Sequence, residues 1–198
     1  MNRWRLRPPY SPEQLAELYK VPHRHDRWPD HLLRVSTSIA VGSWLLRDTR
    51  EALGAPGPVV ADMSTGDAAI PQGILANRSG RLLLGDFAPG YPIQGPIEET
   101  VEYLDDDSVD LFVCSETIEH LADPDTVLKR IRAKAHRLLL STPIDENDTT
   151  LNPEHLWGWD VDQVERMLVN AGWRPVVINE LVFEDFLYDF MIIGAERA

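Results

Sequence analysis

Beyond residue 58 the sequence alternates short apolar runs with stretches of helical periodicity, and this alternation limits the possible folds most strongly. Strands are expected at 59–61, 81–85, 101–104, 109–114, 137–140, 174–179 and 188–195, and helices at about 68–76, from 123, and from 160 to 171. Strands that alternate with helices form a parallel sheet with helices on both faces. The last two strands lack an intervening helix, which favours an antiparallel final strand. We therefore expect an α/β three-layer sandwich with a seven-stranded, mostly parallel sheet.

The first 54 residues have a different pattern and are assigned to a separate N-terminal helical segment, leaving 55–198 as the main domain. Ser11 followed by Pro12 is typical of a helix start, and that helix is expected to reach about Lys20. Asp30 is expected to cap a longer helix that ends before Gly54. We expect these helices to cover a site on the main domain. One of His25, His31 and Arg34 is expected to contact a substrate from this cover.

Composition narrows the partners and the compartment. The 198 residues include one cysteine, Cys114, which excludes an intramolecular disulfide and favours a reducing, cytoplasmic setting. The formal net charge of −13 argues against nucleic acid, whose binding depends on Lys and Arg contacts to phosphate. No apolar run is long enough to span a membrane. The expected partner is a small molecule, and a homodimer is the alternative to a monomer.

A turn of small residues follows the first expected strand. Asp62, Met63, Ser64 and Gly66 lie in the run Asp-Met-Ser-Thr-Gly-Asp-Ala, where small residues allow a ligand to approach the backbone. The second strand ends at Asp86, whose carboxylate can accept both hydrogen bonds of a ribose diol. Because parallel strands end at the same edge of a sheet, the two features are expected to lie together.

The segment 107–124 carries the most specific pattern in the chain. It reads Asp-Ser-Val-Asp-Leu-Phe-Val-Cys-Ser-Glu-Thr-Ile-Glu-His-Leu-Ala-Asp-Pro. It resembles the class I S-adenosylmethionine-dependent methyltransferases, in particular a Glu-x-x-Glu-His subgroup similar to ubiquinone-biosynthesis-type and small-RNA 2′-O-methyltransferases. The resemblance covers about 59–198 and implies a Rossmann-like sheet. The glycine motif of this family is degenerate here, since Ser64 and Ala68 stand where glycines are usual.

The resemblance assigns roles to individual residues. It implies that Asp62, Met63, Ser64 and Gly66 support the methionine part of S-adenosylmethionine, Asp86 its ribose, Phe87 and Glu98 its adenine, and Ser115 the region near the sulfonium. His120, with Glu116, would handle the acceptor, which we expect to be an oxygen of a small molecule.

The same resemblance implies a candidate metal site. Glu116, Glu119 and His120 would share one face of a helical turn, and His155 would join them from a later loop. Two carboxylates and two imidazoles could hold a divalent metal such as Mg²⁺, which would lower the pKa of a bound hydroxyl. Metal-free relatives carry the same Glu-His pair, so a base or structural role for His120 stays open.

Two other functions remain. The degenerate glycine turn is compatible with a methyltransferase-like protein that has lost activity and serves as a binding module. An NAD(P)-linked oxidoreductase on a similar sheet would also use Asp86, but the chain lacks the Gly-x-Gly-x-x-Gly pattern and a Tyr-x-x-x-Lys pair.

Overall fold

The computed structural model describes residues 3–20, 30–48, 56–146, 152–184 and 189–198. Its main sheet has seven strands in the order β4-β3-β2-β5-β6-β9-β8. These strands are β2 (Val59–Asp62), β3 (Arg81–Asp86), β4 (Ile93–Gln94), β5 (Leu111–Ser115), β6 (Arg137–Ile144), β8 (Trp173–Leu181) and β9 (Asp189–Arg197). Strands β4, β3, β2, β5 and β6 are parallel, and β9 runs antiparallel to both β6 and β8. The expected sheet, with its antiparallel last strand, is confirmed.

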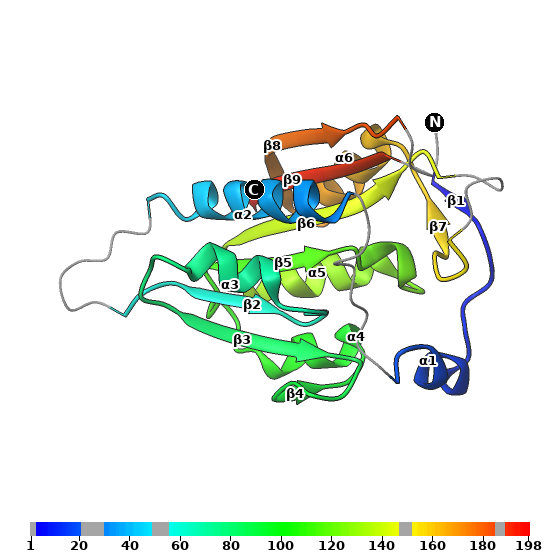
Figure 1. Cartoon of the computed structure of the whole chain (residues 1–198), viewed down its shortest axis with the longest axis horizontal. Helices are drawn as coiled ribbons and strands as arrows, with labels where there is room; N and C mark the ends of the chain where they lie inside the picture. Colours follow the sequence, from blue (N-terminus) through cyan, green and yellow to red (C-terminus); the bar gives the residue numbers. More distant parts are fainter. Residues whose placement is uncertain (1–2, 21–29, 49–55, 147–151, 185–188) are drawn as a thin grey trace.

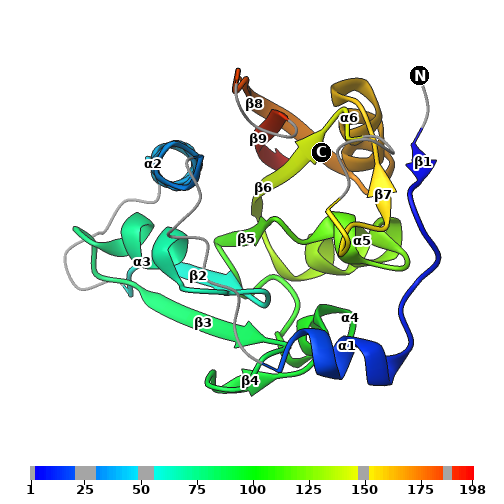
Figure 2. The same ribbon diagram turned by 45° about the vertical axis from the view of Figure 1, so that its right-hand side comes forward.

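Helices cover both faces of this sheet (Figures 1 and 2). They are α2 (His31–Leu45) and α3 (Ala69–Leu75) on one face, and α4 (Ile97–Thr100), α5 (Pro124–Lys134) and α6 (Val161–Asn170) on the other. Alternate residues of the strands feed the two cores, as β structure requires. Val60 and Leu111 pack with α2 and α3, whereas Ala61 and Phe112 pack with α5 and α6. The three-layer sandwich is therefore confirmed.

The start signals of several helices act as the sequence predicts. Ser11 caps α1 (Pro12–Leu18) in a capping box with Gln14. Asp123 and Asp160 cap α5 and α6 through their side chains. Asp30 is different, because it has helical backbone angles and its side chain caps nothing. Its carboxylate is instead paired with Arg34, so Asp30 occupies the predicted N-cap position of α2 but does not cap the helix through its side chain.

The strand expected at 101–104 was wrong. Val101–Tyr103 form a 3-10 turn, and the strand at the outer side of β3 is the two-residue β4. Val101 and Leu104 are both buried while Tyr103 is exposed. A spacing of three residues places Val101 and Leu104 on the same side of a 3-10 turn, which explains how an apolar pattern over four residues was mistaken for a strand.

A second, two-stranded sheet was not expected from the sequence. Strand β1 (Trp4–Arg5) pairs antiparallel with β7 (Trp157–Gly158). In Figure 1 the N-terminal segment then runs down one side of the molecule to α1, which lies beside α4 and β4. Within the described residues, none of the helices has the length and apolar character needed to cross a bilayer.

Candidate active site

The carboxyl ends of β2, β3 and β5 surround a cavity of about 220 Å³. This edge is where the sheet reverses its order of connection, since β2 pairs with β3 on one side and β5 on the other. Ligands of open α/β sheets bind at such a point. Every residue that the sequence assigned to a cofactor lines the cavity: Asp62, Met63, Ser64, Gly66, Asp86, Phe87, Glu98 and Ser115.

The turn after β2 forms although two of the usual glycines are absent. Gly66 has a φ of 57° and Ala68 a φ of 62°, so both adopt the left-handed conformation. Ala68 does so at a cost that a glycine would avoid. The Ser64 hydroxyl lies 2.7 Å from the Thr117 hydroxyl, which ties the turn to the loop after β5. The degenerate motif therefore still forms the tight turn that brings backbone to the cavity.

Asp86 joins two loops at the cavity edge. One carboxylate oxygen accepts the Gly66 N–H and the other accepts the Ala88 N–H, each at 2.8 Å. A carboxylate oxygen can accept more than one hydrogen bond, so Asp86 retains capacity for a ligand hydroxyl. Phe87 follows it directly, and Glu98 faces the same cavity from α4.

Asp62 lies almost fully buried at the end of β2. Burial raises the pKa of its carboxyl to about 7, opposed by a hydrogen bond from the Ser64 N–H and reinforced by the negative charge of Asp86. A positively charged ligand in the cavity would stabilise the ionised form of Asp62.

The backbone conformation of Glu116 keeps its side chain apart from the other candidate metal ligands. It has a φ of 50°, and the helical turn η2 (Ile118–His120) begins only after it. Its carboxylate accepts a hydrogen bond from Ser141 at 2.7 Å and lies 3.4 Å from the Arg34 guanidinium. Burial raises the pKa of Glu116, and the charge of Arg34 opposes this. The predicted shared helical face with Glu119 and His120 therefore does not form.

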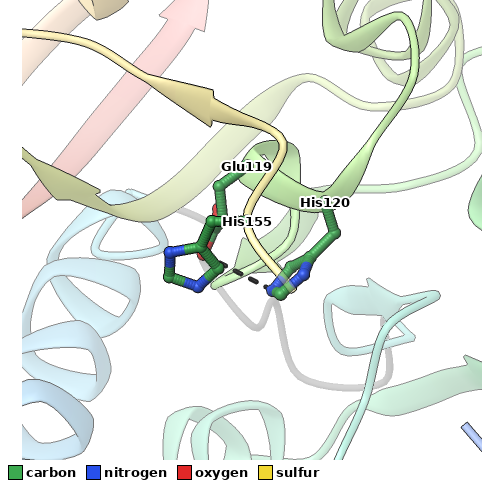
Figure 3. Close-up of side chains that lie close together, drawn as sticks. All are labelled: Glu119, His120 and His155. Atoms are coloured by element: carbon green, nitrogen blue, oxygen red, sulfur yellow. Dashed lines mark ion pairs between the residues drawn. The ribbon is translucent and has the colours of Figure 1, made fainter. Parts of the chain in front are cut away.

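Glu119, His120 and His155 do lie together, as Figure 3 shows. Each offers a ligand atom, and these atoms lie within 4.8 Å of one another. Glu119 is 1% exposed, and its Oε2 accepts a hydrogen bond from Thr142 at 3.0 Å. Its Oε1 accepts no hydrogen bond among the described residues and lies 3.9 Å from His120 Nε2. Burial, then the charge of Glu116, raises the pKa of Glu119 well above its usual value.

The carboxyl of Glu146 orients His155. Its Nδ1 is paired with Glu146, which in turn accepts the Asn152 N–H at 3.0 Å. Burial, with a smaller effect of the Arg7 charge, lowers the pKa of His155 to about 3, and burial raises that of Glu146 to about 7. His155 is therefore neutral at physiological pH. A histidine held by a carboxyl through one nitrogen is the arrangement that orients metal-binding histidines.

The N-terminal helices reach the cavity as expected. His31 and Arg34 of α2 line it, and so does Tyr19, immediately after α1. His25 lies outside the described residues. Tyr19, Thr117 and Glu146 were missed by sequence reasoning, because none belongs to a motif and their positions depend on how loops distant in sequence meet.

Comparisons with known proteins agree with this architecture. The sequence model of a methyltransferase domain family matches residues 81–137. No curated protein sequence matches the chain. Among solved structures, magnesium protoporphyrin IX methyltransferase from Synechocystis, with S-adenosylhomocysteine bound, is 15% identical with a TM-score of 0.63, covering 94% of this chain and 93% of that one.

Two further structures show the range of proteins that share the fold. A 1,6-didemethyltoxoflavin N1-methyltransferase from Burkholderia thailandensis is 18% identical, with a TM-score of 0.62 over 97% of this chain and 92% of that one. A 4+2 cyclase is 8% identical, with a TM-score of 0.65 over 96% and 97%. The chain thus has the Rossmann-like fold of S-adenosylmethionine-dependent methyltransferases, and its central segment matches their domain family.

Proposed function

We propose that the protein is an S-adenosylmethionine-dependent methyltransferase that acts on an oxygen of a small molecule. The observation that carries the proposal is the meeting of three separate loops at one cavity: the turn at Gly66, the carboxylate of Asp86 and the strand end at Ser115. The match to a methyltransferase domain over 81–137 supports it, because this range contains Asp86 and Ser115.

Each part of the cofactor has a matching group in the cavity. Asp62, Met63, Ser64 and Gly66 support the methionine part, Asp86 accepts the ribose hydroxyls, Phe87 and Glu98 flank the adenine, and Ser115 lies near the sulfonium. The buried carboxyl of Asp62 and the carboxylate of Asp86 suit a ligand with two positive groups, the sulfonium and the ammonium of the methionine part.

Methyl transfer is an in-line displacement. The acceptor oxygen forms a bond to the methyl carbon as the carbon–sulfur bond breaks, which releases S-adenosylhomocysteine. The protein contributes mainly by holding the two reactants in line. His120 accepts the hydroxyl proton. Glu116 lines the cavity, but its carboxylate is held between Arg34 and Ser141, which supports a role in positioning the end of β5 over a role as proton acceptor.

The charge of the cavity supports a neutral acceptor. Among the residues that the structure describes, six acidic side chains line it, against the one guanidinium of Arg34: Asp62, Asp67, Asp86, Glu98, Glu116 and Glu154. Arg34 is already paired with Asp30 and Glu116. A phosphorylated or carboxylated acceptor would be repelled, as would a nucleic acid, whereas a neutral alcohol or phenol would not.

A divalent cation is a second component that the site could hold. Glu119 Oε1 is a buried carboxylate oxygen without a hydrogen bond among the described residues, and Glu146 orients His155 beside it. These residues fit a cation. Two imidazoles favour a first-row transition ion such as Mn²⁺ or Zn²⁺ over Mg²⁺. When bound, such an ion would lower the pKa of an acceptor hydroxyl, with Glu119, His120 and His155 as ligands and Glu116 outside this set. His120 would then serve as a ligand instead of as the proton acceptor.

Calorimetry tests the cation directly. Titration of Mn²⁺ and Zn²⁺ into the protein should give one site that is lost in Glu119→Gln, whereas Asp105→Asn, at an exposed position, should leave it unchanged. Equal binding by both variants would contradict a cation at Glu119.

Binding of nucleosides tests the cofactor. We expect S-adenosylmethionine and S-adenosylhomocysteine to bind, and NAD not to bind. Asp86→Asn should weaken binding by about 10- to 100-fold, the effect of one hydrogen bond to a charged group, with Asp105→Asn unchanged. Binding of NAD alone would support an oxidoreductase. Cofactor binding without turnover of any acceptor would support an inactive binding module, which the shared fold of a cyclase keeps open.

A further inference from the structure

Ser64 stands in the turn after β2 at a position where a glycine is usual, and it lines the cavity. Its backbone N–H donates to Asp62 Oδ1 at 3.0 Å. Its Oγ lies 2.7 Å from Thr117 Oγ1, in the loop after β5. Either hydroxyl could donate in that contact, and the direction decides whether Ser64 offers the cavity a proton or a lone pair.

The other contact of the Thr117 hydroxyl fixes this direction. Thr117 is 5% exposed, and its Oγ1 donates to the backbone oxygen of Ser115 at 2.8 Å. A hydroxyl has one proton to donate, whereas a backbone carbonyl can only accept. Because the Thr117 proton is used toward Ser115, Ser64 donates in the contact between the two hydroxyls. The hydrogen bonds therefore run from Ser64 to Thr117 and from Thr117 to the Ser115 carbonyl.

The buried thiol of Cys114 also neighbours Thr117 and does not reverse this order. Burial raises the pKa of the Cys114 thiol, so the sulfur stays protonated at physiological pH. A thiol sulfur is a weak acceptor, and its S–H can itself donate to Thr117 Oγ1. The Ser115 carbonyl oxygen is the stronger acceptor and keeps the Thr117 proton.

Ser64 consequently presents only lone pairs to the cavity. Its proton points to Thr117, so the remaining capacity of its oxygen is that of an acceptor. The carboxyl of Asp62, which accepts the Ser64 N–H, is also an acceptor when it is ionised. A donor with a positive charge makes the strongest hydrogen bonds to such a surface, whereas a carboxylate would be repelled there.

We propose that Ser64 binds the ammonium group of the methionine part through its hydroxyl oxygen, and that Thr117 is the positioning residue that turns the lone pairs toward it. This rests on the proposed methyltransferase function and deepens it by orienting the amino acid, with the ammonium at Ser64 and the carboxylate directed away. The departure from glycine then adds a contact to the cofactor site instead of removing one.

Two ligands that differ only in the ammonium test the contact. S-adenosylhomocysteine carries it, and the deamino analogue 5′-S-(3-carboxypropyl)-5′-thioadenosine lacks it. In Ser64→Ala, calorimetry should show about 10-fold weaker binding of S-adenosylhomocysteine, the effect of one hydrogen bond to a charged group, and binding of the analogue within about twofold of wild type. Ser64→Gly, which restores the usual glycine, should lose the same preference for the ligand with the ammonium.

Thr117→Val tests the positioning role, because it keeps the shape of the side chain and frees the Ser64 hydroxyl. A free hydroxyl spreads over three staggered positions, so S-adenosylhomocysteine should bind about threefold more weakly, with the analogue unchanged. Thr117→Ser retains a hydroxyl and should bind both ligands as the wild type does. Ser36→Ala, which removes an exposed hydroxyl bonded to the Leu33 oxygen, is the matched control and should change neither affinity.

Neutron diffraction of the ligand-free protein measures the hydroxyl directions themselves. The deuterium of Ser64 should point to Thr117 Oγ1, and that of Thr117 to the Ser115 oxygen. The reverse order, unchanged binding of S-adenosylhomocysteine in Ser64→Ala, or equal losses for both ligands would overturn the proposal while leaving cofactor binding intact. Failure of the wild-type protein to bind S-adenosylhomocysteine, with the deuterium positions as expected, would overturn the methyltransferase function and with it the ammonium contact.

Discussion

Arg34 offers the sharpest test of how α2 is attached to the site. Arg34 is 5% exposed, and its guanidinium is paired with the fully buried carboxylate of Asp30 and lies 3.4 Å from Glu116. It also packs over the Phe190 ring at 4.6 Å. Replacement by Met keeps much of the volume but leaves two buried carboxylates without their cation. Removing one partner of a buried ion pair costs about 3–5 kcal/mol, so we expect Arg34→Met to lower the free energy of unfolding by that amount at pH 7.

Urea denaturation measures this change, and Arg174→Met is the matched control. Arg174 pairs with Glu196 at 2.8 Å, but its side chain is 63% exposed, and an exposed pair contributes at most about 1 kcal/mol. The double variant Asp30→Asn with Arg34→Met should recover part of the loss, because one unpaired carboxylate is then removed. A loss below about 1 kcal/mol in Arg34→Met, or equal losses in Arg34→Met and the control, would refute the assignment of Arg34 as the cation that holds α2 to the end of β5.

Three further changes test other parts of the structure. Asp62→Asn removes a carboxyl whose pKa is raised to about 7 in the folded protein. The folded wild-type protein holds a proton there that the unfolded chain loses near pH 4, so the stability of the wild type relative to the variant should fall as pH rises from about 4 to 7. Denaturant titrations measure this difference, and a difference that does not depend on pH would contradict the raised pKa. Ala68→Gly relieves the left-handed φ of 62° and should raise the melting temperature or leave it unchanged; a clear decrease would contradict a strained Ala68. In Gly158→Ala the new Cβ would collide with the Trp4 indole and lie 2.7 Å from the backbone oxygen of Glu146. Amide hydrogen exchange at β1 and β7 should therefore accelerate. Unchanged exchange there would show that the strand pair tolerates the methyl group.

The sheet and the cofactor residues could be predicted because both depend on local patterns. Runs such as Leu111–Ser115 are apolar enough to be buried on both faces, which is typical of the interior strands of a parallel sheet. Once the strands are placed, their carboxyl ends meet at one edge, so Ser64, Gly66 and Asp86 come together whatever the detailed packing.

The features that the sequence did not predict correctly depend on single backbone angles or on pairings between distant segments. Glu116 was expected on a helical face, but its φ of 50° turns its carboxylate to Ser141 and Arg34. Strand β4 has two residues, which leave no periodicity to detect. The pairing of β1 with β7 joins two segments that are far apart in the sequence, at Trp4 and Gly158. No pattern within either segment encodes these meetings.

A crystal structure with S-adenosylhomocysteine bound tests the central claim most directly. The account predicts the ribose hydroxyls on Asp86, the adenine between Phe87 and Glu98, and the homocysteine sulfur on the side of the cavity that holds Ser115 and His120. A nucleoside bound away from Asp86, or a sulfur directed away from His120, would contradict methyl transfer at this site.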